Sequence, residues 1–422
     1  MAGEATHSAP WLYPPWIREH GDALIAMATA APGGPKVAPV RLYPEAEPHL
    51  RLAVSLMARR SPDRFRRAMR ARLVAAMHRE SGACGLIVTL DWSPVMRLLV
   101  EEARKLGLPT AMLLHEGIFF EQDLYYGGAG VVPVVDRALV WGELHRDLFV
   151  SRGYPPERIA VVGSAKLSAA AAIRPRFAAS QWRARLGLDP ERPVVLFALQ
   201  PLDNVAGREA ARAAQRRAIL DAARATAGRV SLVLRPPPAD LPELLPEGAR
   251  TGRLGPHARV VDPGPEPERA PGETLAQSAA VLSMGSTMLI EAVALGRAAL
   301  TLAYDGQKNG MFDALDLPRA AGCDDLVAAL ERLAAGQGSG ASPQTRARLA
   351  ASLGLRDDPS APLAVMAREL AGLARSTTTA LHPGFDPLAW ELGVERMELP
   401  PKLTKFLQRP RSFFKDMKVL KF

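Results

Sequence analysis

The sequence contains little cysteine and few aromatic residues. Cys84 and Cys323 are the only cysteines among 422 residues, and they lie far apart in the chain. Their number and spacing exclude a disulfide framework and a cysteine-based metal centre, and they are typical of a reducing compartment. Aromatic residues make up only 6%, yet the hydrophobic fraction of 48% is ample for large cores. A chain of this length predicts two or three domains.

Long apolar runs are also missing. No stretch of about 18 uninterrupted apolar residues occurs, so the sequence predicts no membrane-spanning helix. The first apolar run, LIAMATAA, is short and begins only at residue 24. The residues before it include four charged side chains: Glu4, Arg18, Glu19 and Asp22. This is not the pattern of a signal peptide. We therefore expect a cytoplasmic protein.

Acidic residues are scarce at one end of the chain. Residues 401–422 hold seven lysines and arginines against one acid, Asp416, and contribute +6 to the net charge of +9. The remainder is nearly neutral, which argues against a nucleic-acid-binding core, so we expect no nucleic acid partner. The basic segment also carries apolar residues: Phe406, Leu407, Phe413 and Phe414. It could lie on an anionic membrane surface, at the inner face of the plasma membrane, or pack back onto the first domain.

Several well-known catalytic motifs do not occur. The sequence has no Walker A motif, no HExxH, no GxSxG elbow and no paired CxxC. The glycines of GGAG (127–130) do not meet the dinucleotide fingerprint. We therefore expect no bound cofactor and no metal site.

Strands and helices alternate along most of the chain. In the first half, strands at 84–90 and 109–115 flank a helix at 93–108. After a Gly-rich loop, strands at 136–142 and 158–164 flank a helix at 143–153, and the pattern restarts at 192–201. Such alternation indicates parallel sheets covered by helices on both faces. We predict an α/β fold of two Rossmann-like domains that face a cleft, with a C-terminal helical tail. The expected boundaries are 1–170 for an acceptor-side domain, 171–375 for a nucleotide-sugar-binding domain, and 376–422 for the tail.

Residues 1–80 are the least readable part. The segment WLYPPW combines proline with aromatics, and PDRFRRAMRARLVAAMHRE (62–80) has the pattern of a basic amphipathic helix.

The stretch AQSAAVLSMGSTMLIEAVALGRAALTLAY (276–304) is the most informative. It predicts strand, turn, helix and strand, and the residues where the helix begins are Ser283, Gly285, Ser286 and Thr287. Unpaired amides and the positive end of the dipole make a helix start suited to a phosphate. Glu291 follows Thr287 by four residues and shares its helix face, where a carboxylate suits ribose hydroxyls. Alternatively, the turn is an ordinary helix cap and Glu291 lies in solvent.

Other polar residues also follow predicted strands, where ligands bind in open parallel sheets. Glu116, beside Gly117, is our first choice of base for taking a proton from an acceptor hydroxyl, and His115 is the second. Alternatively, His115 is an interior residue and Glu116 forms a surface ion pair. Arg235 could clamp a phosphate or be an ordinary strand-end charge. Gln200 and Asn204 complete the candidate nucleotide-sugar-binding set.

Three stretches together resemble a known group: LIVTLDWSPVMRLLVEEARKLGLPTAMLLHEG, DRALVWGELHRDLFVSRGYPPERIAVVGSAKL and SMGSTMLIEAVALGRAALTL. They resemble two-domain GT-B glycosyltransferases of bacterial capsule and surface-polysaccharide synthesis, over roughly residues 84–310. The middle stretch is shared with CDP-glycerol-type polyol phosphotransferases and non-hydrolysing UDP-GlcNAc 2-epimerases. The tail PPKLTKFLQRPRSFFKDMKVLKF looks like a segment of capsular polysaccharide proteins.

The resemblance implies an inverting, metal-independent transfer of sugar from a UDP- or CMP-linked donor to a polysaccharide or glycolipid acceptor. It implies Glu116 as base, with Ser286 and Thr287 at the donor phosphate and Glu291 at the ribose. Where related members carry Lys/Arg-x-His-Pro, this sequence reads Arg235-Pro236-Pro237-Pro238. The lost histidine argues against a CMP-linked donor and leaves an inactive nucleotide-binding subunit as an alternative. The shared middle stretch leaves two further alternatives, a polyol phosphotransferase and a 2-epimerase.

Overall fold

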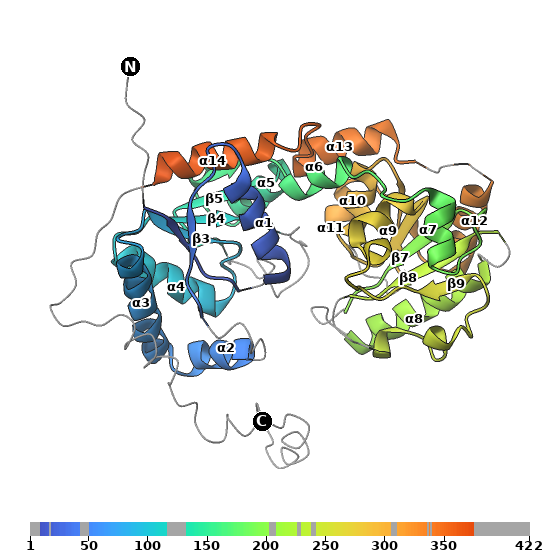
Figure 1. The fold of residues 1–422 in the computed structure, drawn as a ribbon, viewed down its shortest axis with the longest axis horizontal. Helices are drawn as coiled ribbons and strands as arrows, with labels where there is room; N and C mark the ends of the chain where they lie inside the picture. Colours follow the sequence, from blue (N-terminus) through green and yellow to red (C-terminus); the bar gives the residue numbers. More distant parts are fainter. Residues whose placement is uncertain are drawn as a thin grey trace, which may run out of the picture.

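The computed structural model describes residues 9–374, except 17, 43–49, 116–131, 202–207, 226–228, 238–241, 305–309, 336 and 338–339. Within these residues the chain forms two six-stranded sheets with every strand pair parallel. The predicted two-domain α/β fold is confirmed. Figure 1 shows the two halves, blue to green and green to orange, beside each other.

The strand order of the first sheet is β2-β1-β3-β4-β5-β6, and that of the second is β12-β11-β10-β7-β8-β9. The first sheet contains β1 (Trp11–Tyr13), β2 (Val37–Pro39), β3 (Gly85–Val88), β4 (Thr110–Leu113), β5 (Arg137–Val140) and β6 (Ile159–Val161). The second contains β7 (Val194–Ala198), β8 (Ser231–Arg235), β9 (Ala258–Val260), β10 (Ala280–Ser283), β11 (Ala298–Leu302) and β12 (Arg319–Ala320). Strands such as β7 and β8 are buried along their whole length, as expected for parallel strands covered on both faces.

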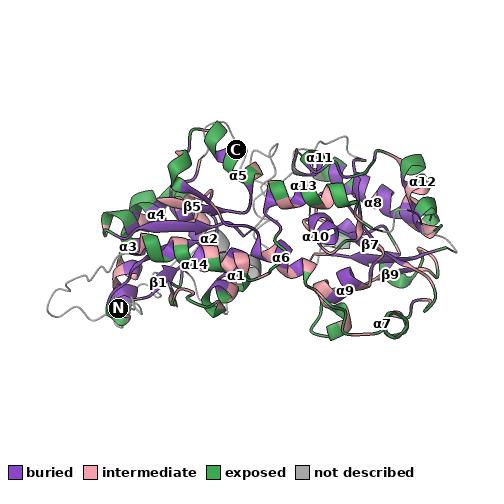
Figure 2. Ribbon diagram, turned by 90° about the horizontal axis from the view of Figure 1, so that it is seen from above, coloured by how far each residue is buried: buried purple, intermediate pink, exposed green. Residues whose placement is uncertain are grey.

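Helices cover both sheets, and their outer faces are exposed (Figure 2). In the first half they are α1 (Arg18–Ala30), α2 (Leu50–Arg60), α3 (Pro62–Arg79), α4 (Pro94–Lys105), α5 (Glu143–Ser151) and α6 (Ala165–Ala171). The later helices are α7 (Ala179–Arg185), α8 (Arg208–Ala225), α9 (Pro271–Gln277), α10 (Met288–Ala294), α11 (Gly310–Ala314), α12 (Cys323–Ala334), α13 (Pro343–Leu353) and α14 (Ala361–Leu373). Short 3₁₀ turns are η1 (Pro156–Arg158), η2 (Pro242–Leu244), η3 (Ala249–Thr251) and η4 (Pro267–Arg269).

Two late helices contact the first half of the chain. Helix α13 packs against both α5 and α10, and α14 packs against α1 and α6. Arg137 of β5 donates to Glu369 of α14, with Nη2 and Oε2 2.6 Å apart. Figure 1 shows α14 lying along the first half. The C-terminal part of the described chain therefore ties the two halves together.

The chain segments that join the halves meet at two glycines. The backbone N–H of Ser164, just before α6, donates to the carbonyl oxygen of Gly354 at 3.0 Å. Gly354 ends α13 with φ +68°, and a Cβ there would overlap Trp141 O and stand 2.7 Å from Gly163 Cα. Only glycine fits this close backbone approach without a shift.

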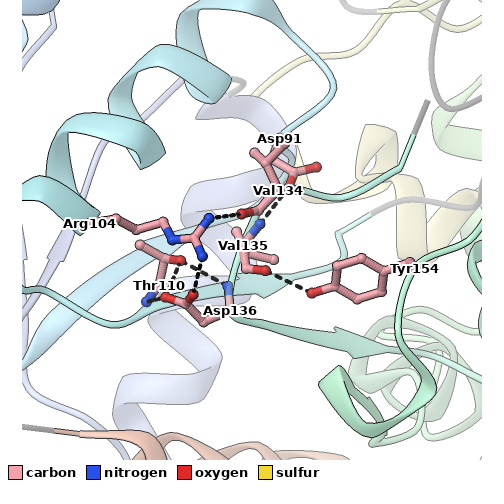
Figure 3. A network of polar contacts seen from close by, with 7 residues as sticks. All are labelled: Asp91, Arg104, Thr110, Val134, Val135, Asp136 and Tyr154. Atoms are coloured by element: carbon pink, nitrogen blue, oxygen red, sulfur yellow. Dashed lines mark hydrogen bonds and ion pairs between the residues drawn. The ribbon is translucent and has the colours of Figure 1, made fainter. Parts of the chain in front are cut away.

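A polar network fixes the chain beside α4 (Figure 3). The buried carboxylate of Asp91 accepts the backbone N–H of Val134 at 2.5 Å and of Val135 at 3.3 Å. Asp136 accepts from the backbone N–H and hydroxyl of Thr110 at 2.9 and 2.8 Å. Because both carboxylates satisfy backbone donors, they act as structural groups here.

Candidate functional site

The turn after β10 is organised by the hydroxyl of Ser283. This buried hydroxyl donates to Ala198 O of β7 at 2.7 Å. It also accepts the backbone N–H of Gly285 at 3.3 Å and of Ser286 at 3.0 Å. Two of the amides expected at the helix start are therefore already engaged inside the turn. Ser283 shapes the loop, and the atoms that remain for a ligand belong to the residues after it.

Thr287 and Glu291 lie together, as their four-residue spacing predicted. The hydroxyl of Thr287 is 3.2 Å from Glu291 Oε1. The side chain of Glu291 is only 15% exposed, so the alternative that it lies in solvent is wrong. A partly buried carboxylate needs a compensating group, and that group comes from the other half of the molecule.

Lys166 of α6 supplies the compensation. Its Nζ lies 2.9 Å from Glu291 Oε1 and 3.0 Å from Thr287 Oγ1. Helices α6 and α10 pack against each other, so the contact joins the crossover after the first sheet to the helix after β10. We call Lys166, Thr287 and Glu291 the Lys166 cluster. Here polar side chains of α6 and α10 meet across the two halves.

The local structure shows why Lys166 points there. Ser164 caps α6, its hydroxyl accepting the N–H of Leu167 at 3.2 Å, so Lys166 falls in the first helical turn. A cation is disfavoured in the first turn because the helix dipole is positive there. The carboxylate of Glu291 offsets this cost, and the lysine side chain, 37% exposed, retains contact with solvent.

His115 follows β4, and the charge of Lys166 acts on its ring. It is buried, and its Nδ1 is 2.7 Å from the carbonyl oxygen of Thr89. A carbonyl only accepts, so Nδ1 carries the hydrogen and Nε2 holds the lone pair of the neutral ring. Burial lowers the pKa of His115 to about 4; the hydrogen bond to Thr89 raises it, and the charge of Lys166 lowers it. The imidazole is therefore neutral at physiological pH.

Two other residues of the predicted site, Arg235 and Gln200, are engaged by groups of the second half. Arg235 is buried, and its guanidinium donates to Arg269 O at 2.8 Å and to the hydroxyl of Thr274 at 3.4 Å. Burial also lowers the pKa of Arg235. It ties β8 to η4 and α9, which matches the alternative of an ordinary structural charge. The backbone of Gln200 is held by the amide of Gln215.

Two of the predicted residues, Glu116 and Asn204, lie outside the described residues. Gly285 and Ser286 lie in the turn before α10, where the Ser286 hydroxyl accepts the N–H of Met288 at 3.3 Å. The described residues bring no three His, Cys, Asp or Glu side chains close enough to hold a metal ion.

Sequence reasoning missed Lys166. The only local signal is a cation just after a strand end, in the segment Gly163-Ser164-Ala165-Lys166. Its importance depends on a contact 121 residues away, which no sequence spacing reveals.

The architecture is of the GT-B type, with two parallel α/β halves. The structure is similar to UDP-GlcNAc 2-epimerase from Neisseria meningitidis bound to UDP-GlcNAc, with a TM-score of 0.54, 9% identity, and coverage of 86% of this chain and 98% of the other. It is similar to the S. aureus MnaA–UDP co-structure, with a TM-score of 0.55, 12% identity, and coverage of 86% and 96%. A further UDP-N-acetylglucosamine 2-epimerase gives a TM-score of 0.54, 12% identity, and coverage of 93% and 98%.

At such low identities these likenesses establish the fold. No family model matches the sequence, and no curated protein matches it. Within the described part of the chain, no helix is both long and apolar enough to cross a membrane.

Proposed function

We propose that the protein is a glycosyltransferase that moves a sugar from a nucleotide-sugar donor to a surface polysaccharide or its lipid-linked acceptor. The observation that carries this proposal is the Lys166 cluster, where a cation, a hydroxyl and a carboxylate meet beside the helix that follows β10. The carboxyl ends of parallel strands are where open α/β sheets bind ligands.

Each group of the cluster suits one part of a nucleotide. The hydroxyls of Ser286 and Thr287 and the ammonium of Lys166 suit a phosphate, and the carboxylate of Glu291 suits ribose hydroxyls. Without ligand, Lys166 and Glu291 neutralise each other at 2.9 Å. A bound donor would replace that ion pair with contacts to its own phosphate and ribose. A fixed cation also stabilises the negative charge that develops on a departing nucleotide.

Removal of the acceptor proton needs a base. We assign Glu116 to this role, with His115 second, because a histidine with a pKa near 4 is a weak base at neutral pH. The buried ring of His115 fits better as a neutral partner beside the reacting groups.

The test separates phosphate from ribose recognition. A thermal-shift screen against UDP, CMP, CDP and GDP first selects the nucleotide, because a ligand that binds only the native state raises Tm. Calorimetry then compares that nucleotide with its nucleoside. Lys166→Met should weaken the nucleotide roughly tenfold to a hundredfold, as for a lost charged hydrogen bond, and leave the nucleoside unchanged. Glu291→Gln should weaken both.

The matched control is Glu331→Gln, an exposed glutamate of α12 that pairs with Arg229. It should leave both affinities unchanged. Unchanged binding in folded Lys166→Met and Glu291→Gln proteins would remove the cluster from the donor site. Full transfer by Glu116→Gln would remove the base assignment.

A second candidate function is 2-epimerisation of a nucleotide sugar. The similar structures bound to UDP-GlcNAc or UDP favour it. An epimerase needs several acid and base groups around the sugar, whereas the described carboxylates of Asp91 and Glu291 are engaged with backbone amides and with Lys166. Incubation with UDP-GlcNAc and no acceptor separates the two functions, because a 2-epimerised product would support epimerisation. No such product there, together with sugar transfer when an acceptor is added, would support our assignment.

Three further features stay predictions. They are the domain boundaries at residues 170 and 375, a role in capsule synthesis, and a cytoplasmic location with residues 401–422 at the membrane.

A further inference from the structure

Positive charge is concentrated in a second segment, apart from the tail. Residues 50–80 contain nine arginines and only two acids, Asp63 and Glu80. Together with residues 401–422 this segment accounts for more than the whole net charge of +9, so the remaining residues are net negative. The segment forms α2 and α3, which belong to the first half (Figure 1).

The arginines of α3 fall into two groups by helix face. Arg66 is paired with Glu101 and Asp63 at 3.1 Å, and Arg72 and Arg79 donate to the backbone carbonyls of Arg41 and Pro39. The other group lies opposite the buried face of α3 and is exposed, together with the last two residues of α2. We call it the arginine face: Arg59, Arg60, Arg64, Arg67 and Arg70.

No described carboxylate forms an ion pair with any of these five arginines. Elsewhere some exposed arginines are paired, as Arg229 is with Glu331, and Arg348 with Asp316 at 2.7 Å. Neighbouring like charges one turn apart destabilise a helix, and Arg64 in the first turn of α3 also opposes the helix dipole. An anionic partner would offset both effects.

The spacing and charge of the arginine face indicate what kind of partner it can bind. Arg64, Arg67 and Arg70 are exposed on the outer side of α3 and follow one another about once per turn, over roughly 9 Å. Among the described residues the large exposed apolar side chains are Val150 and Leu220, which belong to other helices. The contact is therefore electrostatic and does not insert apolar groups.

We propose that the arginine face docks the first half of the protein on a bilayer of anionic phospholipids. Such a bilayer is an extended surface of negative headgroups, complementary to a row of cations on an outer helix face. Each arginine near the surface contributes about fivefold to the partition coefficient at moderate salt. This docking needs no nucleotide sugar, so it stands or falls separately from the proposed function.

Vesicle co-sedimentation of the full chain tests the proposal. The wild type should bind vesicles of phosphatidylglycerol and phosphatidylcholine, should bind pure phosphatidylcholine far more weakly, and should lose affinity as salt rises. The test protein carries three changes: Arg64→Gln, Arg67→Gln and Arg70→Gln. The control removes the same charge from exposed positions of the second half: Arg217→Gln, Arg224→Gln and Arg332→Gln.

The test protein should partition roughly a hundredfold more weakly than the wild type, and the control within about twofold of it. Circular dichroism and melting curves confirm that both proteins fold. Equal binding by the test protein and the wild type would overturn the proposal and assign any membrane affinity to residues 401–422 or another surface. Tighter binding to polyuridylic acid than to vesicles of equal charge would also overturn it, because the face would then recognise a soluble polyanion.

Discussion

Replacing Gly354 with alanine should destabilise the protein far more than the same change at Gly107. Both glycines follow the last residues of a helix, with φ of +68° and +77°. A Cβ at Gly107 has no heavy atom within 4 Å, whereas at Gly354 it would overlap Trp141 O and stand 2.7 Å from Gly163 Cα. The pair therefore separates the cost of a left-handed backbone from the cost of close packing.

The magnitudes follow from these surroundings. A left-handed backbone costs an alanine about 1–2 kcal/mol, which is the whole expected loss for Gly107→Ala. The atoms around Gly354 belong to the backbone and cannot rotate away, so overpacking adds about 1–3 kcal/mol. The expected loss for Gly354→Ala is thus about 2–5 kcal/mol.

Urea unfolding measures the difference in free energy of unfolding between the two variants. Gly354→Ala should have the lower midpoint, with the slope of free energy against urea concentration, m, unchanged. Gly354→Ala should also weaken nucleotide binding, because Gly354 O accepts the N–H of Ser164, the residue that caps the helix carrying Lys166. Equal stability of the two variants would refute the close approach. A large stability loss with unchanged nucleotide affinity would refute the link to Lys166.

Two further predictions concern buried polar groups. The native protein keeps His115 neutral down to about pH 4, while the unfolded chain protonates near pH 6.5, so this residue costs stability as pH falls through that window. In His115→Gln, the slope of unfolding free energy against pH between 4 and 6.5 should be smaller by up to about 1.4 kcal/mol per unit; an identical slope would contradict the buried neutral ring. Asp91→Ala leaves two backbone amides without their acceptor and should cost about 2–4 kcal/mol, against less than about 1 kcal/mol for the exposed Asp63→Ala; equal losses in urea unfolding would contradict the network.

The strands of the central regions were predictable because they are continuous apolar runs bounded by turn residues. The expected strands at 84–90 and 109–115 contain β3 and β4, and the helix between them, α4, begins after Ser93, whose hydroxyl accepts the N–H of Met96. Residues 1–80 gave no such signal. The strands β1 and β2 have three residues each, too few for a period, and they exist because β1 pairs with β3 about 70 residues later.

The site was predictable only where its residues are neighbours in sequence. The contact of Thr287 with Glu291 follows from helical geometry, whereas Lys166 joins them through the packing of α6 against α10. For Arg235 the sequence suggested a ligand contact that the structure does not show. Its position at a strand end suggested a ligand, yet its neighbours in space are a carbonyl and a hydroxyl of its own half, and they satisfy it.

Under the proposed function, the Lys166 cluster would link donor binding to the relative position of the two halves. Lys166 belongs to the crossover after the first sheet, and its partners belong to the helix after β10. A phosphate that attracts Lys166 away from Glu291 would remove one polar contact between the halves and replace it with a contact through the ligand. The free energy of closing the halves and the affinity for the nucleotide would then be coupled, and the coupling would be reciprocal. Under the proposed function this arrangement has an advantage, because Lys166 and Glu291 neutralise each other's charge when the donor does not occupy the cluster.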